Sequence, residues 1–309
     1  MTARFDLDAP PEAAESWFAA ARREGCDECL LVIYDDAITA RAFLPDEGLS
    51  VWEGFASRHG MRVTDALAVS GDRWWSYYCA NERCCPQGGN HLVEAGAVAA
   101  AAVSFGMVAA ANRAEVAGEL AADAVRVRAV TRVMDAMEAS DGLLVGRLMG
   151  SSGSGSLRAQ RPQSLAHLEA LLTAHAERPG PCTAADAAKA LFSLCDIVVR
   201  DAMIAVVPVQ RDTHVMAFWR DLTQCAPPGF VAPPAVLYAL CAWASGDGTR
   251  ANVGIVRALE DRPDYRMAHL LDAGVSGGLN PRELIPDLVQ VADKERTKLL
   301  RRGRRAPRR

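Results

Sequence analysis

The sequence has no long, strongly apolar run and no recognisable export signal. Its longest apolar stretch, residues 95–111, consists mostly of alanine and is interrupted by one serine and two glycines. A helix that spans a bilayer needs about 20 predominantly apolar residues, so we expect no membrane segment. The first eleven residues contain two aspartates and lack the apolar core of a signal peptide. The expected location is therefore the cytosol.

Familiar catalytic signatures are also missing. The sequence contains no G-x-S-x-G elbow, no P-loop, no G-x-G-x-x-G after a predicted strand and no H-E-x-x-H. The six histidines are scattered along the chain. No reaction can be assigned from these patterns. The leading functional prediction is an accessory or regulatory protein that acts by binding an unknown protein partner.

The nine cysteines are an odd number in a long chain without an export signal. Thiols of cytosolic proteins are normally kept reduced, so a disulfide scaffold is not expected. Most of these cysteines should be small buried hydrophobic residues. No cofactor is predicted, and a zinc ion is an alternative only at the cysteine cluster described below.

Positive charge exceeds negative charge at the C-terminal end, whereas acidic residues outnumber basic ones over the rest of the chain. Residues 294–309 contain nine Lys/Arg and one Glu, whereas the whole chain has a net charge of −4. The rest of the chain is therefore clearly acidic, which disfavours a broad nucleic-acid surface. We expect residues 301–309 to form a disordered basic tail, with at most weak nucleic-acid binding through it.

The first half of the sequence has the pattern of an α/β layer. Residues 30–34 (LLVIY) predict a strand buried on both faces, and residues 11–24 and 49–59 on either side of it predict helices. Residues 65–79 predict a β-hairpin that turns at Gly71-Asp72. Trp74 and Trp75 should then point to opposite faces, one buried and the other under the Cys84-Cys85 loop. The predicted fold is a small mixed sheet with a β-hairpin and flanking helices.

The second half predicts helices only. Residues 150–161 begin with GSSGSGS, a composition typical of a flexible linker, so we expect an α/β domain over 1–149 and a helical domain over 162–300. Residues 113–139 predict one long helix. Thr183 and Asp186 have the spacing of a capping box that starts another helix. A final helix over 281–300 should be interrupted near Pro286.

One helical pair has the spacing of half a tetratricopeptide-type repeat. Ala251, Ile255, Ala258 and Pro263 match the small, large, small and proline positions of its second helix. Small residues at such positions let two helices pack closely. Because only one such unit is present, an isolated helical hairpin is favoured over a solenoid. Trp243 and Asp247 at this hairpin are candidate partner-binding residues.

The chain resembles a family through a specific cluster of motifs. In the first half, the run GDRWWSYYC at residues 71–79 is followed by Cys84-Cys85-Pro86. In the second half, the motifs are Arg200-Asp201, the segment 219–228 and the stretch from AW to RALEDRPDY at 242–265. These features resemble an actinobacterial family known as domain of unknown function 4192. Family members begin with a further strand upstream, and Cys26 and Cys29 do not belong to the family pattern. The resemblance implies an α/β fold and a cytosolic setting, and it implies no activity.

Four residues form the first candidate site. Cys79, Cys84, Cys85 and His91 follow the predicted hairpin, and thiolates and imidazole are the ligands that zinc prefers. The C-x4-CC-x5-H spacing differs from that of a standard zinc knuckle. Three interpretations stay open: thiols packed under the tryptophans, a zinc site, or a disulfide or redox pair. Cys26-x2-Cys29 is a further candidate half-site.

Two adjacent carboxylates form the second candidate site. Asp35 and Asp36 follow the predicted strand, where α/β sheets commonly bind ligands. They could bind a metal or act as acid and base, or they could simply stabilise a turn. The alternative function is an enzyme or small-ligand-binding protein with a pocket near Asp35, Asp36 and the Cys79–His91 loop. A deep polar pocket lined by Asp35, Arg73 and Cys85 would favour it, with Asp35, Asp36 and Arg73 as the candidate catalytic residues.

Overall fold

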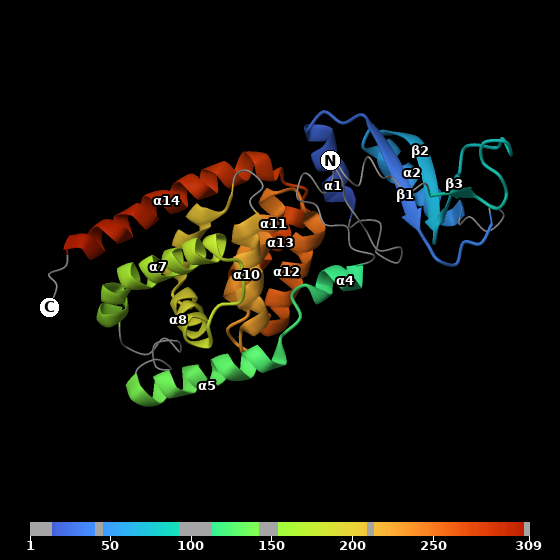
Figure 1. Cartoon of the computed structure of the whole chain (residues 1–309). Helices are drawn as coiled ribbons and strands as arrows, with labels where there is room; N and C mark the ends of the chain where they lie inside the picture. Colours follow the sequence, from blue (N-terminus) through green and yellow to red (C-terminus); the bar gives the residue numbers. More distant parts are fainter. Residues whose placement is uncertain (1–13, 41–45, 93–112, 142–153, 209–212, 306–309) are drawn as a thin grey trace. The chain divides into compact units, whose positions relative to one another are not determined.

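The computed structural model describes residues 14–40, 46–92, 113–141, 154–208 and 213–305 (Figure 1). Its contacts divide the chain into two compact units. The first unit comprises residues 1–102 with 276–279, and the second comprises residues 103–275 with 280–309. The division near residue 102 differs from the predicted linker at 150–161, which falls inside the second unit.

The first unit confirms the predicted small mixed sheet with a hairpin and flanking helices. Its elements follow the order α1 (Glu15–Arg23), β1 (Glu28–Tyr34), α2 (Asp46–Arg58), β2 (Arg62–Ser70), β3 (Arg73–Ser76) and β4 (Asn90–His91). The strands lie side by side in chain order. β1 and β2 run parallel and are joined through α2, whereas β3 and β4 add to the sheet antiparallel. The result is a β-α-β unit extended by a hairpin.

The hairpin forms where the sequence predicted it. Ser70 pairs with Arg73, so the loop between β2 and β3 is the two-residue Gly71-Asp72 turn, in which Gly71 has φ = 54°. Trp75 is 1% exposed, and the adjacent Trp74 points to the other face and is half-buried. One detail differs from the prediction. Trp75 is the buried tryptophan, and it is also the one that contacts the loop containing Cys84 and Cys85, through Gln87 and Gly89. The loop therefore folds over the buried face of the hairpin.

One face of this sheet is covered by the two helices. Phe18 of α1 packs with Phe55 of α2 and with Met61 to form a small core, against which Cys29 and Val63 lie. A second, smaller cluster consists of Ile38, Ala68 and Trp75. These residues alternate along the strands, as expected for a sheet that buries one face.

The prediction that residues 30–34 are buried on both faces is wrong. Leu30, Val32 and Tyr34 are 55%, 40% and 66% exposed, whereas Ile33 is buried. β1 lies at the edge of the described sheet, and α1 and α2 cover only one of its faces. A continuous apolar run does not distinguish a central strand from an edge strand whose open face is also apolar.

The second unit is helical, as predicted. Its elements are α4 (Arg113–Gly118), α5 (Ala124–Asp141), α7 (Ser154–Glu177), α8 (Ala184–Leu194), α9 (Ile197–Ala202), a 3₁₀ turn (Met203–Val206), α10 (Thr213–Cys225), α11 (Ala232–Ala244), α12 (Gly248–Asp261), α13 (Arg266–Ser276) and α14 (Pro281–Arg305). α11 lies at the centre, and every residue from Ala232 to Trp243 is buried. Within the described ranges, no helix is long and apolar enough to cross a membrane.

Helix boundaries differ from the sequence predictions in three places. The predicted helix over 113–139 is interrupted after Gly118, because the Asp123 carboxylate accepts hydrogen bonds from the Val125 and Arg126 amides and starts a new helix. Residues 154–161 of the predicted linker belong to α7. α14 continues through Pro286 to residue 305, so residues 301–305 of the predicted tail are helical. The Thr183 cap is confirmed by a 3.1 Å hydrogen bond from the Asp186 amide.

The α11–α12 hairpin has the close packing that its small residues predicted. Gly254 lies so near α11 that a Cβ atom there would be 2.8 Å from the Ala239 Cβ. Asp247 caps α12 by accepting a 2.9 Å hydrogen bond from the Arg250 amide. Asp261, at the end of α12, accepts hydrogen bonds of 2.6 to 3.0 Å from three amides at the start of α11. The start of each helix of the pair is therefore capped by an aspartate that lies outside that helix: Asp261 for α11 and Asp247 for α12.

Candidate functional site

Three thiols converge in the loop between β3 and β4. The Cys79 and Cys84 sulfurs are 2.8 Å apart, and the Cys84 and Cys85 sulfurs are 3.8 Å apart. All three sulfur atoms lie within 4.8 Å of one another. Cys84 is exposed, Cys79 is half-buried and Cys85 is buried. We call residues 77–89 the cysteine loop.

The far side of the cysteine loop is held by the first residues of β3. The Arg73 guanidinium donates to the Gly88 and Gly89 carbonyls at 3.0 and 3.2 Å, and the Trp75 indole N–H donates to the Gln87 carbonyl at 3.0 Å. Gly89 has φ = 77°, and a Cβ atom there would be 2.6 Å from the Trp75 ring. Only glycine combines this backbone conformation with so close an approach.

The thiol-bearing side of the loop is fixed by polar contacts. The Asn81 carbonyl accepts from the Cys84 and Cys85 amides at 3.1 and 2.7 Å, which forms a tight turn. The Asn90 side chain donates to the Cys84 carbonyl at 2.8 Å. The Ser76 hydroxyl accepts from the Cys79 amide at 3.2 Å. The backbone at each of the three cysteines is therefore tied to a polar partner.

The proximity of these thiols changes their acidity. Hydrogen bonds with the neighbouring Cys79 and Cys85 thiols raise the pKa of the Cys84 thiol to about 12, because they favour its protonated form over a thiolate. The cluster therefore contains a neutral Cys84 thiol at neutral pH unless a cation replaces its proton. It can bind a soft metal ion or form a disulfide, and it is poorly suited to nucleophilic catalysis.

The fourth predicted ligand does not join the thiols. The His91 ring lies in β4, where its Nδ1 is 2.9 Å from an Asp72 carboxylate oxygen at the hairpin turn. Cys26 and Cys29 are also separate, since they pack against the small core between α1 and α2. The structure therefore brings together three of the four residues of this candidate site, and the sequence could not predict which way the imidazole turns.

The paired carboxylates follow β1 as expected. Asp35 accepts a 2.9 Å hydrogen bond from the Ala37 amide and stabilises the turn after the strand, while Asp36 is exposed. Arg73, the third candidate for catalysis, is engaged with the carbonyls of the cysteine loop. Both Asp35 and Arg73 thus have structural contacts that account for their positions.

The open face of the sheet is a feature that sequence reasoning missed. Val32 is in register with Leu67, and Tyr34 is in register with Val69, which in turn pairs with Trp74. Residues in register on neighbouring strands present their side chains to the same face. These residues form a largely apolar surface together with Leu30, which is in register with Asp65. We call this surface the open sheet face. The alternation of Leu30, Val32 and Tyr34 was visible in the sequence, but Leu31 and Ile33 between them concealed it.

The candidate residues of the helical hairpin lie in structural positions. Trp243 is 6% exposed, and a Cβ atom at Gly274 of α13 would be 3.1 Å from its ring, so α13 covers this side chain. Asp247 caps α12 and also accepts a 2.8 Å hydrogen bond from the Arg250 guanidinium. Arg250 in turn pairs with Glu119 at 2.5 Å, and this links α12 to the segment after α4.

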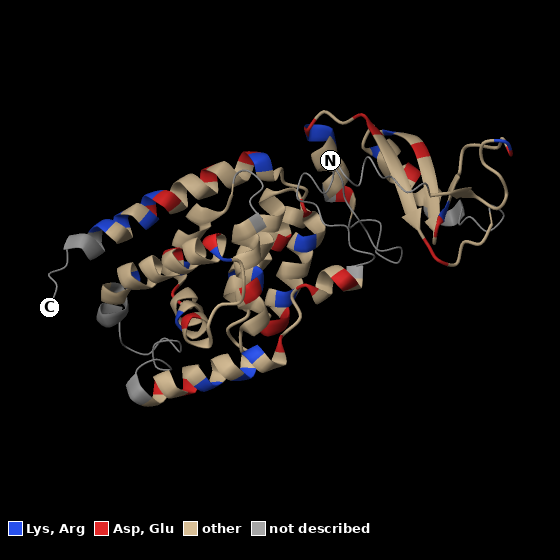
Figure 2. Ribbon diagram, in the orientation of Figure 1, with Lys and Arg blue, Asp and Glu red and all other residues tan. Residues whose placement is uncertain are grey.

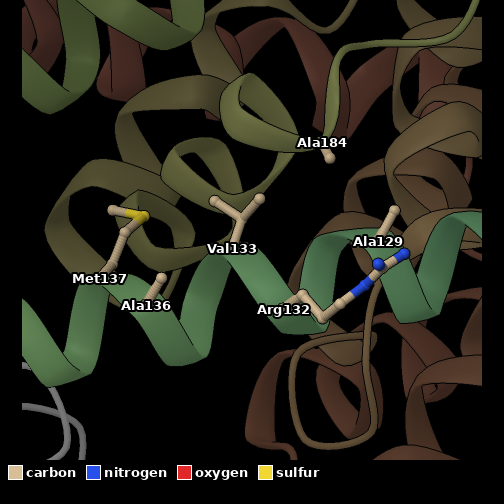
Figure 3. Close-up of a pocket in the computed structure, with 6 residues that line it drawn as sticks. All are labelled: Ala129, Arg132, Val133, Ala136, Met137 and Ala184. Atoms are coloured by element: carbon tan, nitrogen blue, oxygen red, sulfur yellow. The ribbon is translucent and has the colours of Figure 1, made fainter.

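A groove in the second unit follows α5 (Figure 3). Its lining consists of small or apolar residues and one arginine: Ala129, Arg132, Val133, Ala136, Met137 and Ala184. Ala184 comes from the start of α8, and all the others come from α5. The lining contains no carboxylate, thiol or imidazole, so it offers no catalytic group.

The basic C-terminal segment is partly neutralised by neighbouring acids (Figure 2). Arg296 lies 2.5 Å from a Glu169 oxygen and 2.8 Å from an Asp293 oxygen. Lys298 lies 3.2 Å from a Glu295 oxygen. These pairs reduce the positive charge that α14 presents to a polyanion.

The comparisons with known proteins agree with the motif pattern. The motifs of the cysteine loop and the α11–α12 hairpin both lie within a match that covers residues 1–282, to the family described as domain of unknown function DUF4192. No curated protein and no solved structure matches the chain. Because the match extends over both compact units and most of the sequence, the chain belongs to the DUF4192 family.

Proposed function

We propose that this protein is a non-enzymatic accessory or regulatory protein that binds a protein partner on the open sheet face. The observation that carries the proposal is the alternating exposure of Leu30, Val32 and Tyr34 along an edge strand. Single exposed apolar residues are ordinary, but a contiguous apolar surface of this kind is typical of an interaction site. The same face continues onto β2 through Leu67 and Val69.

The charges next to the open sheet face suggest the chemistry of the partner. Asp35 and Asp36 directly follow Tyr34, and the Asp36 carboxylate is exposed. A complementary partner surface would present apolar side chains beside a Lys or Arg that reaches these carboxylates. A tyrosine such as Tyr34 on this surface supplies a large contact area and a polar tip.

A cytosolic location and an actinobacterial origin are part of the same proposal. The nine cysteines, which all lie in the described residues, form no disulfide, and a reducing compartment maintains that state. The family resemblance supports the origin. The alternative function, an enzyme or small-ligand-binding protein around Asp35, Asp36 and the Cys79–His91 segment, has less support because Asp35 and Arg73 are engaged with the backbone.

Site-specific photo-crosslinking in source cells tests the partner proposal. A photoreactive amino acid replaces Val32 in one variant and Val125 in the other, since Val125 is also an exposed valine but lies on α5. We expect position 32 to form a discrete adduct with another protein through a peptide that contains apolar residues next to Lys or Arg. Adding Tyr34→Asp should reduce the adduct at least about tenfold, because a central aromatic residue contributes roughly 2 kcal/mol or more to binding.

Three outcomes would overturn this function. Position 32 could give no adduct, it could give the same adducts as position 125, or its adducts could all be internal to the chain. Circular dichroism of the Tyr34→Asp variant provides the control for folding. Tyr34 is 66% exposed, so the substitution should leave the spectrum unchanged.

A further inference from the structure

We propose that Cys79, Cys84 and Cys85 together bind one soft divalent cation of the zinc class through their thiolates. Sulfur ligands favour such ions over hard cations like magnesium or calcium. This site uses residues different from those of the open sheet face, so the two proposals stand or fall independently.

The distances between sulfur atoms fit a shared ion with one adjustment. Two thiolates that bind zinc at about 2.3 Å in tetrahedral geometry lie roughly 3.8 Å apart. The Cys84 and Cys85 sulfurs already have that separation of 3.8 Å. The Cys79 and Cys84 sulfurs, at 2.8 Å, must separate by about 1 Å. The Cys84 side chain is exposed, so rotation about its χ1 bond can supply this movement.

The third thiol favours a metal over a simple disulfide. A disulfide between Cys79 and Cys84 would leave the Cys85 sulfur unused, although the Asn81 turn brings it into the cluster. Cys85 is 4% exposed, and its backbone amide donates a 2.7 Å hydrogen bond to the Asn81 carbonyl, which fixes its position in the loop. All three sulfur atoms can bind one metal ion, whereas a disulfide would use only two of them.

The loop also lacks a large core of its own. The buried apolar residues beneath it are Ile38, Ala68 and Trp75. Small segments with so little apolar burial are commonly stabilised by a metal ion or a cross-link. The Arg73, Trp75 and Asn90 hydrogen bonds already order the loop, which lowers the entropic cost of binding an ion.

Three thiolates leave one tetrahedral position open. His91, the nearest imidazole in the sequence, is held by Asp72 at the hairpin turn. The fourth ligand is therefore water or a donor atom brought by a bound molecule. Cys84 faces solvent, so that position is accessible from outside.

Metal titration of the full-length, reduced, chelator-treated protein tests the site. Zinc is the probe, measured by competition with a colorimetric chelator, and cobalt reports thiolate ligation through its sulfur-to-metal charge-transfer absorption. The wild type and the control variant Cys26→Ser should each bind one ion per chain. Cys84→Ser should lose more affinity than the roughly 10- to 100-fold that removal of an outer-shell partner costs. Cys85→Ser should have the same effect.

Each other result would refute the metal site. The reduced wild type could fail to bind zinc, or Cys84→Ser could bind it as tightly as Cys26→Ser does. In a third such result, mass spectrometry finds a Cys79–Cys84 disulfide, and the protein does not bind zinc after reduction. If the buried Cys85→Ser variant misfolds, the Cys84→Ser variant still tests the site. Cys84 is exposed, so its replacement by serine should leave the wild-type tryptophan fluorescence unchanged.

Discussion

Gly89 is the single residue on which the shape of the cysteine loop depends most directly. Its φ of 77° and its approach to the Trp75 ring place two demands on one position. We expect Gly89→Ala to destabilise the first unit by at least about 2 kcal/mol, since left-handed strain and a steric clash each cost roughly 1–3 kcal/mol. Urea denaturation followed by tryptophan fluorescence measures this loss.

Gly25→Ala separates the two costs. Gly25 has φ = 81° and no neighbouring atom within 4 Å of the added Cβ. This variant should show the backbone cost alone and lose about 1 kcal/mol. Equal losses in the two variants would mean that the Trp75 contact contributes nothing.

His175 makes the stability of the second unit depend on pH. The side chain is buried against Phe218, and burial lowers the pKa of its imidazole below the usual 6.5. The neutral ring therefore contributes stability that is complete above pH 6.5 and is lost as the pH falls through the lowered value. Replacing it by His175→Leu should flatten the change in urea midpoint between about pH 7.5 and about pH 5.5.

The matched control for this titration is His269→Gln. His269 is exposed on α13, so this variant removes an imidazole without changing the buried core. The explanation fails if the His175→Leu variant keeps the full pH dependence. Sequence reasoning recognised the Thr183 cap from two residues and their spacing, but it could not identify His175, because burial depends on which helices meet around it.

At the level of elements, the close packing of α11 against α12 requires that Gly254 has no side chain. Alanine is a better helix former than glycine by about 1 kcal/mol, so Gly254→Ala should stabilise an isolated helix. In this pair the added methyl group would lie 2.8 Å from the Ala239 Cβ and 2.9 Å from the Ala235 carbonyl oxygen. We expect a net loss of about 1–3 kcal/mol from overpacking, measured by thermal unfolding.

Gly248→Ala is the corresponding control, because a Cβ atom at this first residue of α12 meets no atom within 4 Å. It should be neutral or slightly stabilising. A Gly254→Ala variant as stable as Gly248→Ala would contradict the close packing of the two helices.

The predictable elements were those with local signals. The hairpin followed from the Gly71-Asp72 turn between two β-prone runs, and the small-residue spacing from Ala251 to Ala258 indicated the helical pair. The exposure of β1 was not predictable, because it depends on which side α2 covers. The interruption of the helix over 113–139 depends on Asp123 and on Glu119, whose carboxylate pairs with Arg250 more than 100 residues later.

For the whole molecule, the division into two units predicts two unfolding events. The core of the second unit gathers buried residues from α5, α8, α10, α11 and α12, whereas the described residues of the first unit form two small clusters. Calorimetry of the full chain should resolve a first transition from the smaller unit and a second at higher temperature. Residues 113–309 expressed alone should reproduce the second transition. One transition for the full chain, together with an unfolded fragment, would contradict two independently folded units.

The sequence misplaced the division between the units for a compositional reason. The Gly/Ser run at 150–156 has the composition of a linker, but the chain from Ser154 onward forms a helix that packs with α8 and α14. Composition describes the local freedom of a segment, whereas a boundary depends on where contacts between segments become few. The three thiols could be proposed as a cluster because a short loop brings them together.

The cap that Asp261 places on α11 also affects the order in which the protein can fold during synthesis. Every side chain from Ala232 to Trp243 is destined for the interior, yet the carboxylate that completes the start of this helix follows about thirty residues later. A nascent chain that has emerged only as far as α11 therefore presents an unfinished apolar helix to the surrounding solvent. Until α12 leaves the ribosome, this segment is a natural substrate for chaperones that bind hydrophobic peptides.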